Sequence, residues 1–260
     1  MKKIRGSSSF FDLTEEEKRE YAGKKLFDPI RYGSSFNENV DQTFLWRDYL
    51  KIHVHPHFNA PKKPSGFSEI IEEYSMRTRE ITSDLLKGIS EGLGLEAEYI
   101  KEKMETERGS QLMVINLYPP CPEPEVAIGM PPHSDHGFLT LLVQNHIQGL
   151  QIFHNGLWLP PIPPHPNSFL VNLGDHMEIL TNGKYKSVVH RVVVNCEVAR
   201  ISIGTAHGPP LDTVVKPAEQ LVDQEGQPLA YRGIKYRDYL ELQQSSQLNA
   251  KSCLDHVRCS

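Results

Sequence analysis

Long apolar runs are missing from this 260-residue chain, and none approaches the roughly 18 residues needed to cross a bilayer. The first residues, Met1 to Gly6, are polar and lack the apolar stretch of a secretory signal. These absences argue against a membrane protein and against a secreted one. We therefore predict a cytoplasmic location and no membrane partner.

Cysteine and basic charge are also scarce. The four cysteines form no C-x-x-C pair, which favours reduced thiols over a disulfide framework or a zinc site. The 33 acidic residues exceed the 28 lysines and arginines, and no long basic run occurs. This balance argues against nucleic acid as a partner. We expect a monomer that binds small molecules.

Short β-branched and apolar runs dominate the second half of the chain. Strands are predicted at six places: 112–118, 138–143, 149–153, 168–173, 186–195 and 200–205. Asn155-Gly156 separates two of these runs as a hairpin turn, and Asn182-Gly183 turns the chain into another. Many short strands with proline- and glycine-rich connections predict a mainly β protein with a double-stranded β-helix (jelly roll) core.

Helices are expected chiefly in the N-terminal half, where they would flank this core. A capping box at Thr14–Glu17 opens a short helix to about Gly23, and the segment 27–36 reads as a loop. Apolar residues at helical spacing predict three further helices: 65–92, 96–105 and 231–244, the last beginning after Gly233. We divide the chain into a helical part (1–108), the jelly-roll core (109–212) and a C-terminal helix and tail (213–260).

The pattern His133-Ser134-Asp135 places an imidazole and a carboxylate two residues apart. Residues i and i+2 of a strand face the same way, so both side chains could meet one metal ion. His190 lies in the β-branched run S-V-V-H-R-V-V-V and could supply a third ligand. Two imidazoles and one carboxylate leave three coordination positions open, as non-haem Fe(II) requires.

A second group of histidines, His53, His55 and His57, also alternates along the chain. No carboxylate or thiolate stands at a useful spacing from them. We therefore interpret this group as a histidine-bearing strand or loop and not as a metal site.

The spacing of the first group is specific. Fifty-four residues separate Asp135 from His190, Arg200 follows His190 by ten, and Tyr118-Pro119-Pro120-Cys121-Pro122 stands upstream. This pattern resembles the plant soluble 2-oxoglutarate- and Fe(II)-dependent dioxygenases, a family of flavonoid, alkaloid and hormone hydroxylases and desaturases. The likeness extends from about Phe10 to the C-terminus.

The resemblance assigns roles to residues of this chain. His133, Asp135 and His190 match the iron ligands, and Arg200 and Ser202 match the pair that holds the distal carboxylate of 2-oxoglutarate. A guanidinium binds a carboxylate through two donors, which a lysine could not do.

Two residues of the first predicted strand complete the expected cofactor pocket. Tyr118 matches the tyrosine that assists the arginine and serine. Asn116 lies two residues earlier and would face the same way, so we give it a supporting role.

The substrate side departs from the family pattern. The family often places an aromatic residue six positions after the cofactor arginine, whereas this chain has Ala206, followed by His207. This suggests a roomier or more polar pocket. His136 and Phe138, which follow the metal motif, are further candidates to contact substrate.

The resemblance implies an enzyme that binds Fe(II) and the co-substrate 2-oxoglutarate, with ascorbate as reductant. Such an enzyme uses O₂ to hydroxylate, desaturate or demethylate a small plant specialised metabolite, such as a flavonoid, alkaloid or terpenoid, and releases succinate and CO₂. The protein's part is orientation and a dry pocket.

Two alternatives stay open. The family carries a longer segment before Phe10, so the chain could be a truncated, catalytically silent homologue that still binds a small ligand. It could also be a jelly-roll module with another metal or none, although such a module has no need for the Arg200 and Ser202 pair.

Overall fold

A computed structural model describes residues 9–23, 25–34, 44–160, 168–222, 228–245 and 252–259. Its strands are β1 (Ile30–Ser34), β2 (Phe44–Leu45), β3 (Asp48–His55), β4 (Ser110–Tyr118), β5 (Ala127–Ile128), β6 (Met130–His133), β7 (Leu139–Gln144), β8 (Leu150–His154), β9 (Leu157–Leu159), β10 (Leu170–Leu173), β11 (His190–Val192), β12 (Arg200–Gly208), β13 (Val214–Val215) and β14 (Ile234–Lys235). Its α-helices are α2 (Glu15–Arg19), α3 (Phe67–Gly92), α4 (Tyr99–Lys103), α5 (Asp175–Leu180), α6 (Tyr236–Ser245) and α7 (Ser252–Asp255). Short 3₁₀ turns lie at Thr106–Arg108 and Glu219–Leu221.

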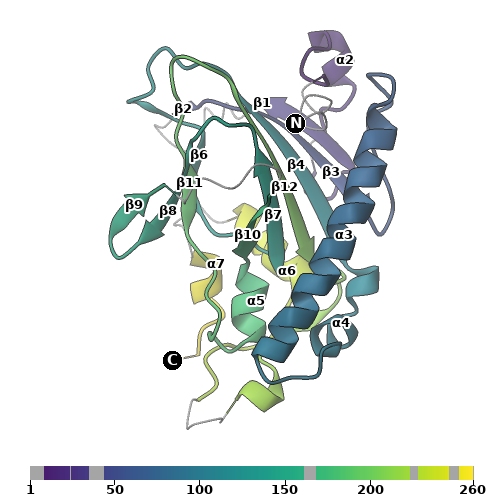
Figure 1. Ribbon diagram of the computed structural model, residues 1–260, viewed down its shortest axis with the longest axis vertical. Helices are drawn as coiled ribbons and strands as arrows, with labels where there is room; N and C mark the ends of the chain where they lie inside the picture. Colours follow the sequence, from purple (N-terminus) through teal and green to yellow (C-terminus); the bar gives the residue numbers. More distant parts are fainter. Residues whose placement is uncertain are drawn as a thin grey trace.

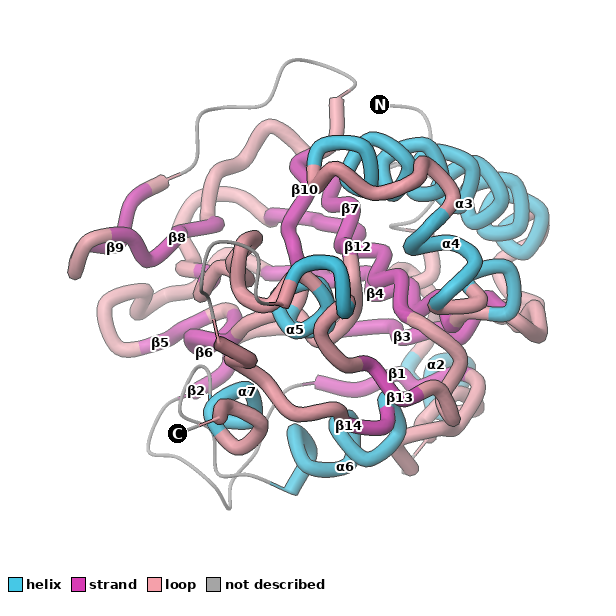
Figure 2. Tube along the Cα trace, turned by 90° about the horizontal axis from the view of Figure 1, so that it is seen from below, coloured by secondary structure: helices cyan, strands magenta, loops and turns pink. Residues whose placement is uncertain are grey.

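Two antiparallel sheets form the core. The main sheet has the order β1-β3-β4-β12-β7-β10, and a smaller sheet has the order β6-β11-β8-β9 (Figure 1). Helices α3 and α6 lie on opposite sides of the main sheet (Figure 2). The prediction of a mainly β protein with a jelly-roll core and flanking helices is confirmed.

Strand alternation gives the main sheet two different faces. Leu50 and Ile52 of β3 are fully buried and pack in one cluster with Phe67 and Ile71 of α3. Lys51 lies between them and therefore points to the opposite face. We call this opposite face the inner face. The smaller sheet packs on it, because Tyr118 of β4 shares a core cluster with residues of β8 and β11.

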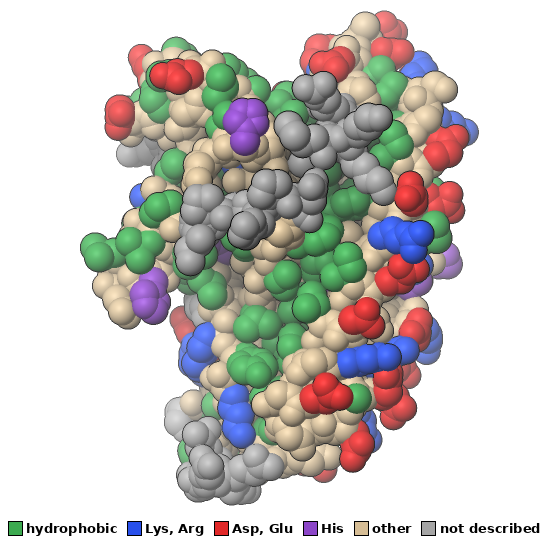
Figure 3. Space-filling view, in the orientation of Figure 1, with side chains coloured by type: hydrophobic (Ala, Val, Ile, Leu, Met, Phe, Trp, Pro, Cys, Tyr) green, Lys and Arg blue, Asp and Glu red, His purple; other side chains and the backbone are tan. Residues whose placement is uncertain are grey.

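Helix α3 confirms the predicted amphipathic helix. Its buried positions include Phe67, Ile71 and Leu86, and charged side chains line its outer side (Figure 3). The capping box is also confirmed, since Thr14 Oγ1 accepts from the Glu17 backbone amide and the Glu17 carboxylate accepts in return. No helix of the described residues is both long and apolar enough to cross a bilayer.

The predicted loop over 27–36 is wrong at Ile30–Ser34, which form strand β1, and residues 35–36 lie outside the described residues. The segment contains Gly33 and Pro29, which are common in loops, but Gly33 is needed here because another side chain comes close to its Cα. A Cβ atom there would lie 2.9 Å from the hydroxyl oxygen of Tyr49, the opposite residue on β3. The glycine therefore makes room for an aromatic side chain across the strand pair.

Some predicted boundaries are too wide. The strand expected over 186–195 shrinks to β11, and the helix expected over 96–105 shrinks to α4 and a 3₁₀ turn. Both expected Asn-Gly turns are confirmed: Asn155 and Gly156 have φ of 49° and 80°, and Asn182 and Gly183 have φ of 49° and 81°. Asn155-Gly156 joins the paired strands β8 and β9, and positive φ at both residues is what a type I′ hairpin requires. Asn182-Gly183 instead turns the chain after α5 toward β11.

Helix α5 was not predicted. All six of its residues are buried, including the polar Asp175, His176 and Glu178, so the sequence shows no apolar stripe at helical spacing. Its Glu178 is fully buried and accepts hydrogen bonds from the Tyr231 hydroxyl at 2.6 Å and from the Ser187 amide at 2.8 Å. Lys186 and Arg258 lie within 3.4 and 3.5 Å of the same carboxylate. Glu178 thus ties the segment before β11 to the C-terminal region.

We expect Glu178→Ala to lower the free energy of unfolding by about 3 kcal/mol, because the buried partners of the carboxylate lose their acceptor. Urea denaturation followed by circular dichroism would measure the change. Glu219→Ala removes an exposed carboxylate and serves as the control. Equal stability of the two variants would contradict the role given to Glu178.

Candidate metal centre and cofactor pocket

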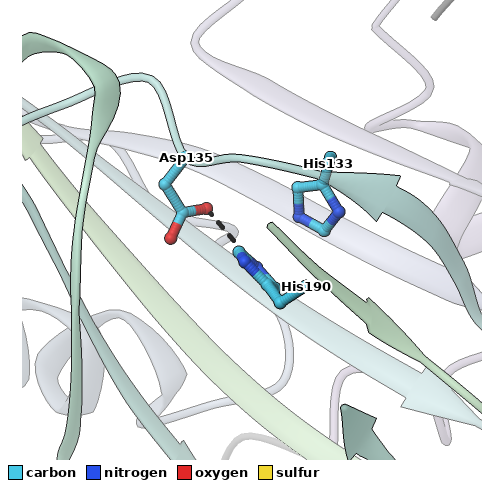
Figure 4. Close-up of side chains that lie close together, drawn as sticks. All are labelled: His133, Asp135 and His190. Carbon is cyan, nitrogen blue, oxygen red and sulfur yellow. Dashed lines mark ion pairs between the residues drawn. The ribbon is translucent and has the colours of Figure 1, made fainter. Parts of the chain in front are cut away.

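His133, Asp135 and His190 converge where the two sheets meet. His133 ends β6 and is paired directly opposite His190, the first residue of β11. The ligand atoms of all three residues lie within 4.8 Å of one another (Figure 4). The imidazole centroids are 4.2 Å apart, and His190 Nε2 is 3.8 Å from Asp135 Oδ1. Residues far apart in the sequence thus form one compact donor set.

The reason for this convergence differs in part from the one that the sequence suggested. Asp135 does not share a strand with His133, because β6 ends at His133 and β7 begins at Leu139. The carboxylate is instead held from the main sheet, where Asn172 of β10 donates its amide to Asp135 Oδ2 at 3.3 Å. A strand pair therefore aligns the two imidazoles, and a neighbouring sheet positions the carboxylate.

Hydrogen bonds orient both rings. His133 Nδ1 lies 2.8 Å from the carbonyl of Pro131, and His190 Nδ1 lies 3.1 Å from the carbonyl of Val188. A carbonyl only accepts, so each Nδ1 carries the proton and each Nε2 keeps a free lone pair. The structure thus offers two Nε2 ligands on adjacent strands.

The protonation states suit a metal ion. Burial, aided by the nearby His190, lowers the pKa of His133 to about 4. Burial acts to raise the pKa of Asp135, but the two imidazoles outweigh it and the pKa is lowered. Neutral imidazoles and an ionised carboxylate are the forms that bind metal, and this donor set fits Fe(II) with open coordination positions.

Arg200 begins β12 on the inner face and is 1% exposed. Its guanidinium lies 5.0 Å from the ring centre of Tyr118, the opposite residue on β4, and Nη2 donates to Gln144 at 2.7 Å. Among the described residues, Arg200 Nε and Nη1 have no hydrogen-bond partner. A buried cation with two free donors is suited to a carboxylate, such as the distal carboxylate of 2-oxoglutarate.

Ser202 is buried two residues further along the inner face. It lies opposite Asn116 of β4 and Gln144 of β7. Asn116 Oδ1 in turn accepts from Arg47 Nη1 at 3.3 Å. Sequence reasoning missed Gln144 and Arg47. A signal existed for Gln144, which continues the two-residue alternation of β7 with a polar side chain just past the predicted end of the strand.

The four candidate substrate residues separate into two pairs. His136 borders a cavity, with Nδ1 2.7 Å from the Tyr236 hydroxyl, and Ala206 lies on the inner face, four residues after Ser202. Phe138 is 1% exposed in the hydrophobic core, and His207 follows Ala206 and so points to the opposite face. The structure therefore does not bring Phe138 or His207 to the metal centre.

Comparisons with known families agree with this geometry. Residues 109–209 match the family described as 2OG-Fe(II) oxygenase superfamily, and residues 2–73 match the one described as non-haem dioxygenase in morphine synthesis N-terminal.

Individual relatives match over most of the chain. Rice (Oryza sativa subsp. japonica) 2-oxoglutarate-dependent dioxygenase 19 is 48% identical over 95% of this chain and 73% of its own length. Thebaine 6-O-demethylase of Papaver somniferum is 40% identical, with coverage of 96% and 70%.

Solved structures show the same fold. A crystal structure of JOX2 in complex with 2OG, Fe and JA superposes with a TM-score of 0.91 at 29% identity, covering 99% of this chain and 77% of that one. The dioxygenase for auxin oxidation in rice gives 0.82 at 25% identity, with coverage of 99% and 85%. The three-residue donor set and the buried Arg200 agree with these relatives. The chain therefore belongs to the 2OG-Fe(II) oxygenase superfamily and is a plant-type 2-oxoglutarate-dependent dioxygenase, an oxidoreductase.

Proposed function

We propose that this enzyme uses Fe(II), 2-oxoglutarate and O₂ to hydroxylate, desaturate or demethylate a small plant specialised metabolite, such as a flavonoid, alkaloid or terpenoid. Succinate and CO₂ are the co-products, ascorbate keeps the iron reduced, and the enzyme acts as a cytoplasmic monomer. One observation supports the proposal most: Arg200, which has two donors without a described partner, packs on Tyr118, and Tyr118 shares a core cluster with Val192 of β11, the strand that carries His190.

The residues have separate tasks in this proposal. His133, Asp135 and His190 hold the iron through two Nε2 atoms and a carboxylate oxygen. When bound, iron and 2-oxoglutarate together supply the O₂-dependent oxidation of a substrate C–H bond. Arg200 receives the distal carboxylate of 2-oxoglutarate, with Ser202 as a second donor and Tyr118 packed against the guanidinium. Burial of Arg200, Ser202 and Tyr118 keeps water away from the site of the distal carboxylate.

The two alternatives have less support. A catalytically silent homologue would not need all three metal-binding side chains and the arginine clamp, and both are present. A jelly-roll module without iron would leave the buried Arg200 donors without a purpose, which carries a free-energy cost.

The first test is succinate release from 2-oxoglutarate with Fe(II), ascorbate and O₂, measured with and without a panel of plant metabolites. We expect His190→Ala to abolish both iron binding and succinate release, because only two ligands remain. His154→Ala, which removes an exposed histidine of β8, is the control and keeps both. Succinate release that persists in His190→Ala would refute the proposed metal centre.

A second test concerns the co-substrate. We expect Arg200→Lys to raise the KM for 2-oxoglutarate by about 10- to 100-fold, because a lysine keeps the charge but loses the two-donor contact. Steady-state kinetics at varied 2-oxoglutarate would measure it, with the exposed Arg77→Lys as the control. An unchanged KM for 2-oxoglutarate in Arg200→Lys would contradict the role of Arg200 in binding the distal carboxylate.

A further inference from the structure

A cavity of about 810 Å³ lies between the inner face of the main sheet and α6. Residues of β1, β3, β4 and α6 line it, and so does His136, the residue after Asp135. Its volume is that of a pocket for a small organic molecule. Apolar side chains form much of the wall: Leu26, Phe27, Pro29, Leu112, Leu211 and Leu240.

The charge of this cavity is opposite to that of the protein. The chain carries a net charge of −5, yet four of the described lining residues are lysine or arginine and one, Asp212, is acidic. The side chain of Asp212 is 79% exposed and lies 3.7 Å from Arg237. Arg108 lies 3.5 Å from Glu105. Arg31 and Lys51 are left as the cations of the inner wall, and no ion pair joins either of them to a described acidic residue.

Arg31 and Lys51 lie directly opposite each other on β1 and β3. Like charges in this arrangement destabilise a strand pair. Arg31 is 8% exposed, and its Nε has no hydrogen-bond partner among the described residues. Burial lowers the pKa of Arg31, outweighing the opposite effects of Tyr49 and Asp28. Burial, together with Arg31 and Arg47, lowers the pKa of Lys51 to about 7. A bound anion would relieve these costs.

The inner face connects the two cations to the metal centre. Lys51 is on β3, and Asn172, which holds Asp135, is on β10. Between them β12 presents Gly204 and Ala206 on the inner face. A Cβ atom at Gly204 would have no neighbour closer than 3.8 Å. These small residues leave room for a ligand that reaches from the cations toward the metal ligands.

We propose that this cavity binds the substrate, and that the substrate is a small, largely apolar carboxylic acid whose carboxylate is received by Lys51 and Arg31. The apolar part then lies along the inner wall toward His136 and the metal centre. The inference deepens the proposed function and rests on it, because it takes the metal centre as the place of oxidation.

Binding without turnover provides the test. Isothermal titration calorimetry is run on the full chain with Fe(II) and 2-oxoglutarate, with O₂ excluded. The probes are benzoate, cinnamate and 2-naphthoate, each compared with its methyl ester. We expect at least one acid to bind about ten-fold or more tightly than its ester, since the ester loses a charge-assisted contact. If no acid binds more tightly than its ester, the proposal is overturned.

Variants locate the contact. Lys51→Met and Arg31→Met should each abolish the preference for the acid, Lys51→Arg should keep it, and Lys216→Met, which removes an exposed charge, should leave it unchanged. The melting temperature of Lys51→Met should be equal to or higher than that of the wild type, because a like-charge contact is removed. A preference that survives in both methionine variants would overturn the assignment.

The visible absorption of the 2-oxoglutarate–iron chelate separates this inference from the proposed function. If the chelate fails to form while acids still bind more tightly than esters, the proposed function fails and the carboxylate site stands. If an acid removes the chelate absorption, it competes at Arg200, and the inference about Lys51 and Arg31 is overturned.

Discussion

The two-residue period of the main sheet is the constraint on which the rest of the structure depends. Along each of β3, β4 and β12, alternate residues point to opposite faces of the sheet. One set, with Ile52 and Ile203, packs with α3 in the core, and the other, with Lys51 and Ser202, forms the inner face. Because the strands are antiparallel and in register, residues far apart in the chain share this face. Stability and chemistry are thus supplied by alternate residues of the same strands.

The inner face also departs from what stability alone would select. Arg200 keeps two buried donors without a described partner, and Arg31 faces Lys51 across a strand pair. Each arrangement costs free energy in the ligand-free protein. The hydrophobic cluster beneath α3 offsets such costs from the other side of the sheet. The free-energy cost at Arg200, Arg31 and Lys51 is therefore offset by core residues on the opposite face of the sheet.

Sequence reasoning found the features that a local motif or a fixed spacing encodes. These include the metal-binding residues, Arg200, the capping box and the long helix α3. It missed α5 because a helix buried on all sides has no periodic pattern, and it missed β1 because Gly33 resembles a turn residue. It could not pair Arg31 with Lys51, since strand register depends on the whole sheet. Sequence motifs were thus enough to predict the metal-binding and co-substrate residues. The residues that line the proposed substrate cavity could be identified only from the folded structure.

The buried carboxylate of Glu178 joins two parts of the protein that lie far apart in the sequence. It accepts from Ser187, three residues before the metal-binding His190, and from Tyr231, which pairs with Arg258 near the C-terminus. A local opening of the C-terminal region would therefore free one side of this carboxylate and loosen the strand that carries a metal ligand. The local stability of the strand that carries His190 is in this way coupled to that of the C-terminal segment.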